Sequence, residues 1–163
     1  MRIPALIALL SANPAFADIT VTFAEGAPTD RFTIAANDSC VTGPVQMTID
    51  LSGSDAGLVF DVTAAGAGVE VFQPFVLVSG AQNVTGYSEL TDGDTMLRLD
   101  IATLTTPIAF TTDLDDTIGQ REITISNAEI AGATVTLSTA DETITAPFGD
   151  NAVARLTPNG CAG

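Results

Sequence analysis

The chain has 163 residues, with 20 acidic and five basic side chains and a formal net charge of −15. It contains no histidine and no tryptophan. A surface this acidic repels nucleic acid and anionic lipid headgroups and attracts cations. The missing histidine excludes most nucleophilic hydrolases, because these usually pair a Ser or Cys nucleophile with a His base.

The N-terminus has the layout of a secretory signal peptide. Arg2 supplies a positive charge, residues 3–10 are apolar, and Ala15-Phe16-Ala17 fits a small-x-small cleavage pattern. A membrane anchor would need about 20 apolar residues, and Asn13 and Pro14 interrupt this stretch. We therefore expect cleavage after Ala17 and a secreted or periplasmic product, residues 18–163, that forms one domain without a membrane span.

Apolar and polar residues alternate along seven segments, which is typical of half-buried β-strands. The expected inward positions are Ile19, Val21 and Phe23; Val45, Met47, Ile49 and Leu51; Leu97, Leu99 and Ile101; Ile108 and Phe110; Ile123 and Ile125; Val135 and Leu137; and Ile144, Ala146 and Phe148. Turn-forming sequences, among them Gly26-Ala27-Pro28 and Gly53-Ser54-Asp55, separate the segments. Short strands at regular spacing indicate a β-sandwich or an antiparallel barrel. We expect an all-β antiparallel sandwich, jelly-roll or Ig-like, of about ten strands.

The chain has two cysteines, Cys40 and Cys161. An even number of cysteines in an exported chain predicts a disulfide. A soft metal site and a redox pair are the alternatives. Two cysteines without histidine are a poor zinc site, and there is no C-x-x-C sequence. We therefore expect a disulfide that ties the C-terminal tail to an early loop.

The densest group of carboxylates lies in the run DLDDT, where Asp113, Asp115 and Asp116 follow an expected strand. Calcium binds about six to eight oxygen atoms from carboxylates, carbonyls and water. Carboxylates crowded into one loop repel one another unless a cation lies between them. The run predicts a calcium site. A solvated turn that contains no ion is the alternative.

A second group of carboxylates consists of Asp55, Asp61 and Glu70, around the Gly-containing segment 64–70. Asp61 and Glu70 are candidates to complete the calcium site from a neighbouring loop. The sequence Asp92-Gly93-Asp94 is typical of a hairpin turn. We expect its carboxylates to be solvated.

Two stretches, GLVFDVTAAGAGVEVFQPF (57–75) and FTTDLDDTIGQREITISNAEIAGATVTL (110–137), resemble bacterial secreted proteins that are similar to the sponge aggregation factor core. The sponge proteins are extracellular proteoglycan cores that mediate calcium-dependent, carbohydrate-linked cell adhesion. The resemblance implies a secreted β module of the adhesion type. It supplies no catalytic motif.

Together these observations predict a non-catalytic adhesion or binding module that is calcium-dependent. Its expected partner is an extracellular glycan, a cell-surface protein or another copy of the chain, and not nucleic acid. One alternative is a glycan-active hydrolase that uses a carboxylate pair, Asp113 with Glu129 or Asp61 with Glu70. The other is an acidic structural protein of the cell envelope that has no ion site.

Overall fold

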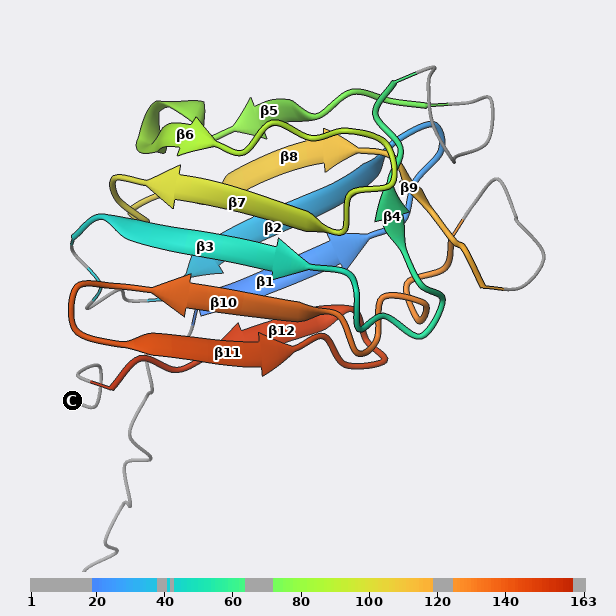
Figure 1. The fold of residues 1–163 in the computed structure, drawn as a ribbon. Helices are drawn as coiled ribbons and strands as arrows, with labels where there is room; N and C mark the ends of the chain where they lie inside the picture. The colour runs from blue at the N-terminus through green and yellow to red at the C-terminus, as the bar shows by residue number, and fades with distance from the viewer. Residues whose placement is uncertain (1–18, 38–40, 42, 64–71, 119–124, 160–163) are drawn as a thin grey trace, which may run out of the picture.

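The computed structural model describes residues 19–37, 41, 43–63, 72–118 and 125–159. Two five-stranded antiparallel sheets pack face to face, and this confirms the predicted single-domain β-sandwich (Figure 1). The described residues contain twelve strands, ten of them in the two large sheets, and no α-helix. The predicted signal peptide, 1–17, and both cysteines, Cys40 and Cys161, lie outside the described residues.

The first sheet has the strand order β12-β1-β2-β8-β5, and every neighbouring pair in it is antiparallel. Its strands are β1 (Ile19–Ala24), β2 (Asp30–Ala36), β5 (Val76–Ser79), β8 (Ile108–Thr112) and β12 (Val153–Leu156). The second sheet has the order β11-β10-β3-β7-β6 and is also antiparallel. Its strands are β3 (Val45–Asp50), β6 (Val84–Tyr87), β7 (Met96–Ile101), β10 (Thr134–Ser138) and β11 (Thr143–Pro147).

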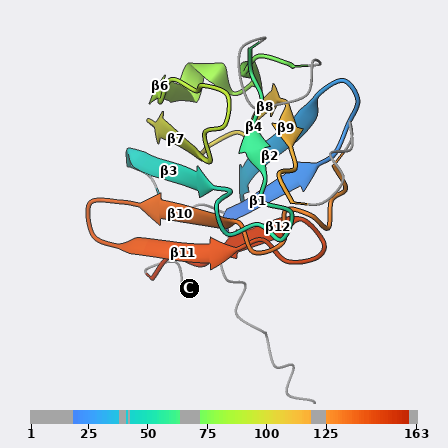
Figure 2. The same ribbon diagram turned by 45° about the vertical axis from the view of Figure 1, so that its right-hand side comes forward.

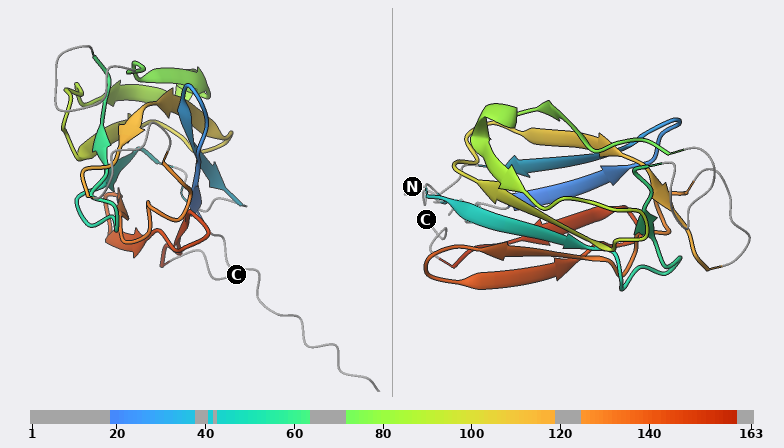
Figure 3. Two further views of the ribbon diagram at one scale, coloured as in Figure 1. Left: turned by 90° about the vertical axis from the view of Figure 1, so that its right-hand side faces the viewer. Right: turned by 45° about the horizontal axis from the view of Figure 1, so that its top comes forward.

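Two shorter elements complete the fold. A 3-10 turn, η1 (Ala81–Asn83), connects β5 of the first sheet to β6 of the second. A small ribbon of β4 (Val59–Phe60) and β9 (Leu114–Asp115) lies at the right-hand end of the sandwich in Figure 1. Figure 2 turns this end forward, and the left panel of Figure 3 looks directly onto it. No helix among the described residues is long and apolar enough to cross a membrane.

The core lies between the two sheets and contains the residues that the alternating pattern predicted. In β1 and β3 the predicted inward side chains are all buried, and the polar residues between them face outward. The same holds for β7 and β10. One predicted strand is not present as expected: Ile125 is buried but belongs to no strand, and Ile123 lies outside the described residues.

Aromatic rings connect the strands of the first sheet within the core. Phe32 of β2 stacks on Phe110 of β8, with ring centroids 4.9 Å apart. Phe23 of β1 and Phe75 pack against this pair, each at a centroid distance of 5.0 Å. Aromatic pairs of this kind add stabilisation beyond their buried area. They fix the position of β2 relative to β8. Asp30 is the first residue of β2, and Asp113 directly follows β8.

The register of β7 can be tested with two adjacent side chains. Leu97 is fully buried, whereas Met96 is 53% exposed. We expect Leu97→Ala to lower the free energy of unfolding by about 2–5 kcal/mol, because it leaves a cavity in the core. Met96→Ala should change it by less than about 0.5 kcal/mol. Urea denaturation measures both values. A reversed order of the two effects would mean that the strand is shifted by one residue.

Candidate functional site

The DLDDT run is not a solvated turn. After β8 ends at Thr112, the chain continues into β9, which pairs with β4 at the end of the sandwich. All three carboxylates are buried: Asp113 is 9% exposed, and Asp115 and Asp116 are 5% exposed each. The solvated-turn alternative is therefore wrong for these residues, since carboxylates are rarely buried without a specific partner.

The pairing of β4 with β9 brings two distant parts of the sequence together. Phe60 lies opposite Leu114, and the backbone N–H of Asp61 donates to the carbonyl oxygen of Asp113 at 3.1 Å. Side chains alternate across a strand. Phe60 and Leu114 therefore pack into the core, while Asp61, Asp113 and Asp115 share the opposite face of the ribbon.

Asp61 and Asp115 form the centre of this group. A side-chain hydrogen bond links their carboxyl groups. Asp61 is 2% exposed, and its Oδ2 atom is buried with no hydrogen-bond partner in the part of the chain that the structure describes. A buried polar atom without a partner is rare in proteins and costs free energy. A hydrogen-bond donor or a cation beside this oxygen would therefore be favourable.

Asp30, which the sequence did not single out, is a fourth buried carboxyl group at this end. It is the first residue of β2, and its Oδ2 accepts a hydrogen bond from the Leu114 N–H at 3.1 Å. Its Oδ1 accepts one from the Gly26 N–H at 3.2 Å. Asp30 thus connects β2 to β9 next to Asp113. We call the side chains of Asp30, Asp61, Asp113 and Asp115 the acidic end.

The remaining candidates have different surroundings. Asp92 accepts hydrogen bonds from the backbone N–H groups of Val62 and Thr63, both at 2.8 Å. The expectation that Asp92 is only solvated is therefore wrong, since its carboxylate orders the segment that follows Asp61. Asp55 is exposed. Glu70 lies outside the described residues. Glu129 accepts a hydrogen bond from the Ser126 N–H and so belongs to a local turn.

The local electrostatics favour the protonated form of three carboxyl groups. Burial raises the pKa of Asp30 to about 7, assisted by Glu25 and Asp115 and opposed by the hydrogen bonds from Gly26 and Leu114. Burial raises the pKa of Asp113 to about 7, with further contributions from Asp30, Asp115 and Asp61. Burial and then the charges of Asp115 and Asp92 raise the pKa of Asp61 to about 6.

Among the described residues, no cationic side chain lowers the raised pKa values of Asp30, Asp61 and Asp113. The only ion pair between described residues joins Arg98 to Asp100 on β7. Nor does any group of three or more His, Cys, Asp or Glu side chains in the described parts of the chain have the placement to hold a metal ion. The acidic end supplies a pair of facing carboxyl groups with one unpartnered oxygen. Such a pair can share a proton, or it can provide part of the coordination of a cation.

Comparisons with protein-family models, with curated proteins and with solved structures find no match to this chain.

The raised pKa values predict how stability depends on pH when no divalent ion is present. The folded pKa values of Asp30, Asp61 and Asp113, about 7, 6 and 7, lie above the ordinary value of 3.8. Between about pH 4 and pH 7 the folded state therefore holds protons that the unfolded state has released. The free energy of unfolding should fall as the pH rises through this window. Urea denaturation in EDTA at a series of pH values measures the decline.

Asp113→Asn should flatten part of this profile, because the amide stays neutral at every pH. The exposed Asp141 is a matched control, and Asp141→Asn should keep the slope of the wild type. An Asp113→Asn profile as steep as that of the wild type would contradict the assignment.

Proposed function

We propose that this chain is a secreted, non-catalytic binding module whose acidic end takes up Ca²⁺. The observation that carries the proposal is the Oδ2 atom of Asp61, which is buried with no hydrogen-bond partner among the described residues and lies beside the buried carboxyl groups of the acidic end. Isolated buried charges are expensive. A cation beside Asp61 and Asp115 would supply the missing partner and would favour the ionised form of both groups.

The donor set is suited to calcium rather than to softer metals. All candidate ligands are oxygen atoms, and the chain has no histidine. Calcium prefers carboxylates, carbonyls and water, whereas transition metals favour imidazole and thiolate ligands. The pair of Asp61 and Asp115 is less than a complete coordination shell, so other oxygen ligands must complete it. The expected affinity is that of extracellular modules, with a Kd of about 10⁻⁴ to 10⁻³ M.

The remaining parts of the proposal come from the sequence. Export with cleavage after Ala17 is consistent with a sandwich whose first strand begins at Ile19. The disulfide between Cys40 and Cys161 accompanies export. A role in adhesion follows from the similarity to secreted proteins that resemble the aggregation factor core. The partner is an extracellular glycan, a cell-surface protein or another copy of the chain.

Calcium should stabilise the fold specifically. At ten times its Kd, an ion that binds only the folded state adds about 1.4 kcal/mol to the free energy of unfolding, enough to raise the Tm by several degrees. We expect millimolar CaCl₂ at pH 7.5 to raise the Tm more than MgCl₂ or NaCl at matched ionic strength. The double variant Asp61→Asn/Asp115→Asn should lose this calcium-specific increase. Because it removes buried charges, it should still fold.

Non-specific screening of the acidic surface also raises the Tm, so a charge-matched control is needed. Asp141 and Asp150 are both exposed. Asp141→Asn/Asp150→Asn removes the same formal charge and should keep the full calcium response. Equal stabilisation by all three salts, or a calcium response that survives in Asp61→Asn/Asp115→Asn, would refute the site.

The non-catalytic part of the proposal has its own test. The hydrolase pairing of Asp113 with Glu129 needs both carboxyl groups to face one substrate, but the Glu129 carboxylate accepts a hydrogen bond from Ser126 in a local turn. We expect no release of reducing ends when the protein is incubated with soluble polysaccharides for a day. Release that disappears in Asp113→Asn would establish the hydrolase instead.

A further inference from the structure

The outer surface of the second sheet carries an ordered group of hydroxyl side chains. The inward residues of β3, β10 and β11 pack into the core, so the residues between them face away from it. Six of these outward residues are Thr or Ser. They form the hydroxyl patch, which consists of Thr48, Thr134, Thr136, Ser138, Thr143 and Thr145. Figure 1 shows this sheet in front, with its outer face toward the viewer.

The strand register places the hydroxyl groups in rows. Thr136 of β10 lies opposite Thr48 of β3 on one side and opposite Thr145 of β11 on the other. Ser138 lies opposite Thr143 in the next row. Neighbouring strands are about 4.8 Å apart, and outward residues of one strand are about 7 Å apart. The hydroxyl patch is therefore a regular array on a sheet surface.

Hydrogen bonds between side chains hold parts of this array in place. The hydroxyl oxygens of Thr136 and Thr145 are 2.8 Å apart, and the Thr143 hydroxyl donates to Ser138 Oγ at 3.3 Å. In each pair one hydroxyl donates to the other, and a hydroxyl oxygen has two lone pairs. Acceptor and donor capacity therefore remains available to a ligand. Because β-branched side chains have few rotamers, little entropy is lost when a ligand binds.

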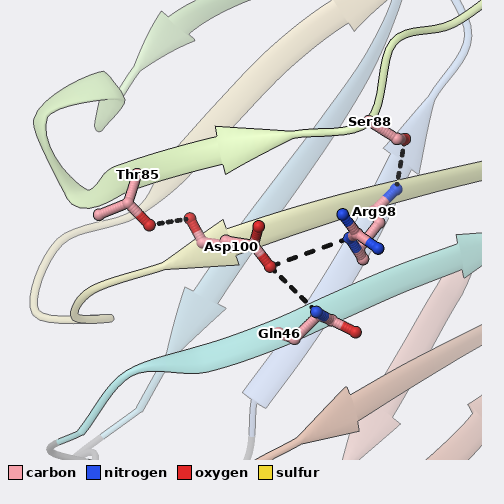
Figure 4. A network of polar contacts seen from close by, with 5 residues as sticks. All are labelled: Gln46, Thr85, Ser88, Arg98 and Asp100. Carbon is pink, nitrogen blue, oxygen red and sulfur yellow. Dashed lines mark hydrogen bonds and ion pairs between the residues drawn. The ribbon is translucent and has the colours of Figure 1, made fainter.

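The six residues of the hydroxyl patch carry no charge, and the carboxylate of Asp50, opposite Thr134, lies at its edge. Strands β10 and β11 contain no charged residue. At the margin on β7, Arg98 pairs with Asp100, and the Asp100 carboxylate also accepts a hydrogen bond from the Gln46 side-chain amide at 3.0 Å (Figure 4). An anionic ligand would be repelled by the rest of the surface, and the neighbouring cation, Arg98 opposite Thr48, is already paired with Asp100. A neutral ligand rich in hydroxyl groups matches it.

We propose that the hydroxyl patch binds a neutral polysaccharide. This inference rests on the proposed function, since it specifies the partner of the binding module. Repeating sugar hydroxyl groups can pair with rows of Thr hydroxyl groups by hydrogen bonds, with each site donating and accepting. The patch has no aromatic ring on which a sugar could stack. Single contacts are therefore weak, and binding depends on many contacts along one chain.

The test is affinity electrophoresis of the whole exported protein in gels that contain xyloglucan, laminarin, dextran or galactomannan. The anionic polysaccharide alginate is the comparison. We expect at least one of the four neutral polysaccharides to retard the wild type, and alginate not to. Thr136→Val/Thr145→Val keeps the shape and strand preference of both residues but removes two hydroxyl groups. It should weaken the retarding interaction about tenfold, as expected for two hydrogen bonds.

The matched control is Thr22→Val/Thr33→Val. These residues are also cross-strand partners, but they lie on β1 and β2 of the other sheet. This variant should bind like the wild type. The proposal is overturned if none of the four neutral polysaccharides retards the protein, if Thr136→Val/Thr145→Val binds unchanged, or if alginate retards it more strongly. Analytical ultracentrifugation without polysaccharide measures the oligomeric state. A wild-type dimer that becomes monomeric in Thr136→Val/Thr145→Val would overturn the proposal, because the patch would then be a self-association surface.

The two proposals fail separately. Asp61→Asn/Asp115→Asn alters the calcium response and leaves the hydroxyl patch intact, whereas Thr136→Val/Thr145→Val alters polysaccharide retardation and leaves the acidic end intact. If retardation depends on Thr136 and Thr145 but the protein does not respond to calcium, the polysaccharide proposal is supported and the calcium site is refuted. A calcium response without any retardation would support the calcium site and refute the polysaccharide ligand.

Discussion

The burial of several carboxyl groups at one end of the sandwich is the constraint on which the rest of this structure depends. The short ribbon of β4 and β9 turns Phe60 and Leu114 into the core, and the same alternation forces Asp61, Asp113 and Asp115 onto one shared face. The fold therefore cannot gain the apolar contacts of this ribbon without also bringing the carboxyl groups together. Ionised groups so close together in a buried site repel one another, and the raised pKa values of Asp30, Asp61 and Asp113 follow from this crowding and from burial.

The rest of the sandwich stabilises this unfavourable arrangement. Phe32 and Phe110 stack between β2 and β8, and Asp30 and Thr112 lie opposite each other at the ends of these same strands. The position of Asp30 relative to Asp113 is thus fixed by aromatic packing, several residues away from the carboxyl groups. A ligand at the acidic end would meet a largely preorganised set of oxygen atoms, because the strands that carry them are held by the core.

The sequence predicted the sandwich because most core positions repeat every second residue. Ile19, Val21 and Phe23 are one example, and Leu97 and Leu99 are another. It did not predict the ribbon of β4 and β9, because two residues are too few for a periodic pattern. The DLDD run resembled a solvated turn for the same reason. Its buried Leu114, between two aspartates, was the only local indication that the segment is a strand.

The sequence did not predict a role for Asp30, for a different reason. Asp30 stands alone among non-acidic neighbours in the sequence, and only the pairing of β2 with β8 brings it to Leu114, which lies 84 residues further along the chain. Long-range contacts of this kind leave no local signal. Asp61 was found because the sequence grouped it with nearby carboxylates. Its closeness to Asp113 and Asp115 could not be derived, since that depends on the register of the ribbon.

The distribution of charge separates two surfaces with different physical requirements. The acidic end concentrates buried carboxyl groups, so its state depends on proton and cation concentration. The hydroxyl patch has no formal charge, and hydrogen bonds between neutral groups respond little to ionic strength. Elsewhere the formal charge is strongly negative, and surfaces of like charge repel one another. A neutral, hydroxyl-rich polymer would find matching hydrogen-bond donors and acceptors on the outer face of the second sheet, and that face is formed by strands whose inner residues lie in the core.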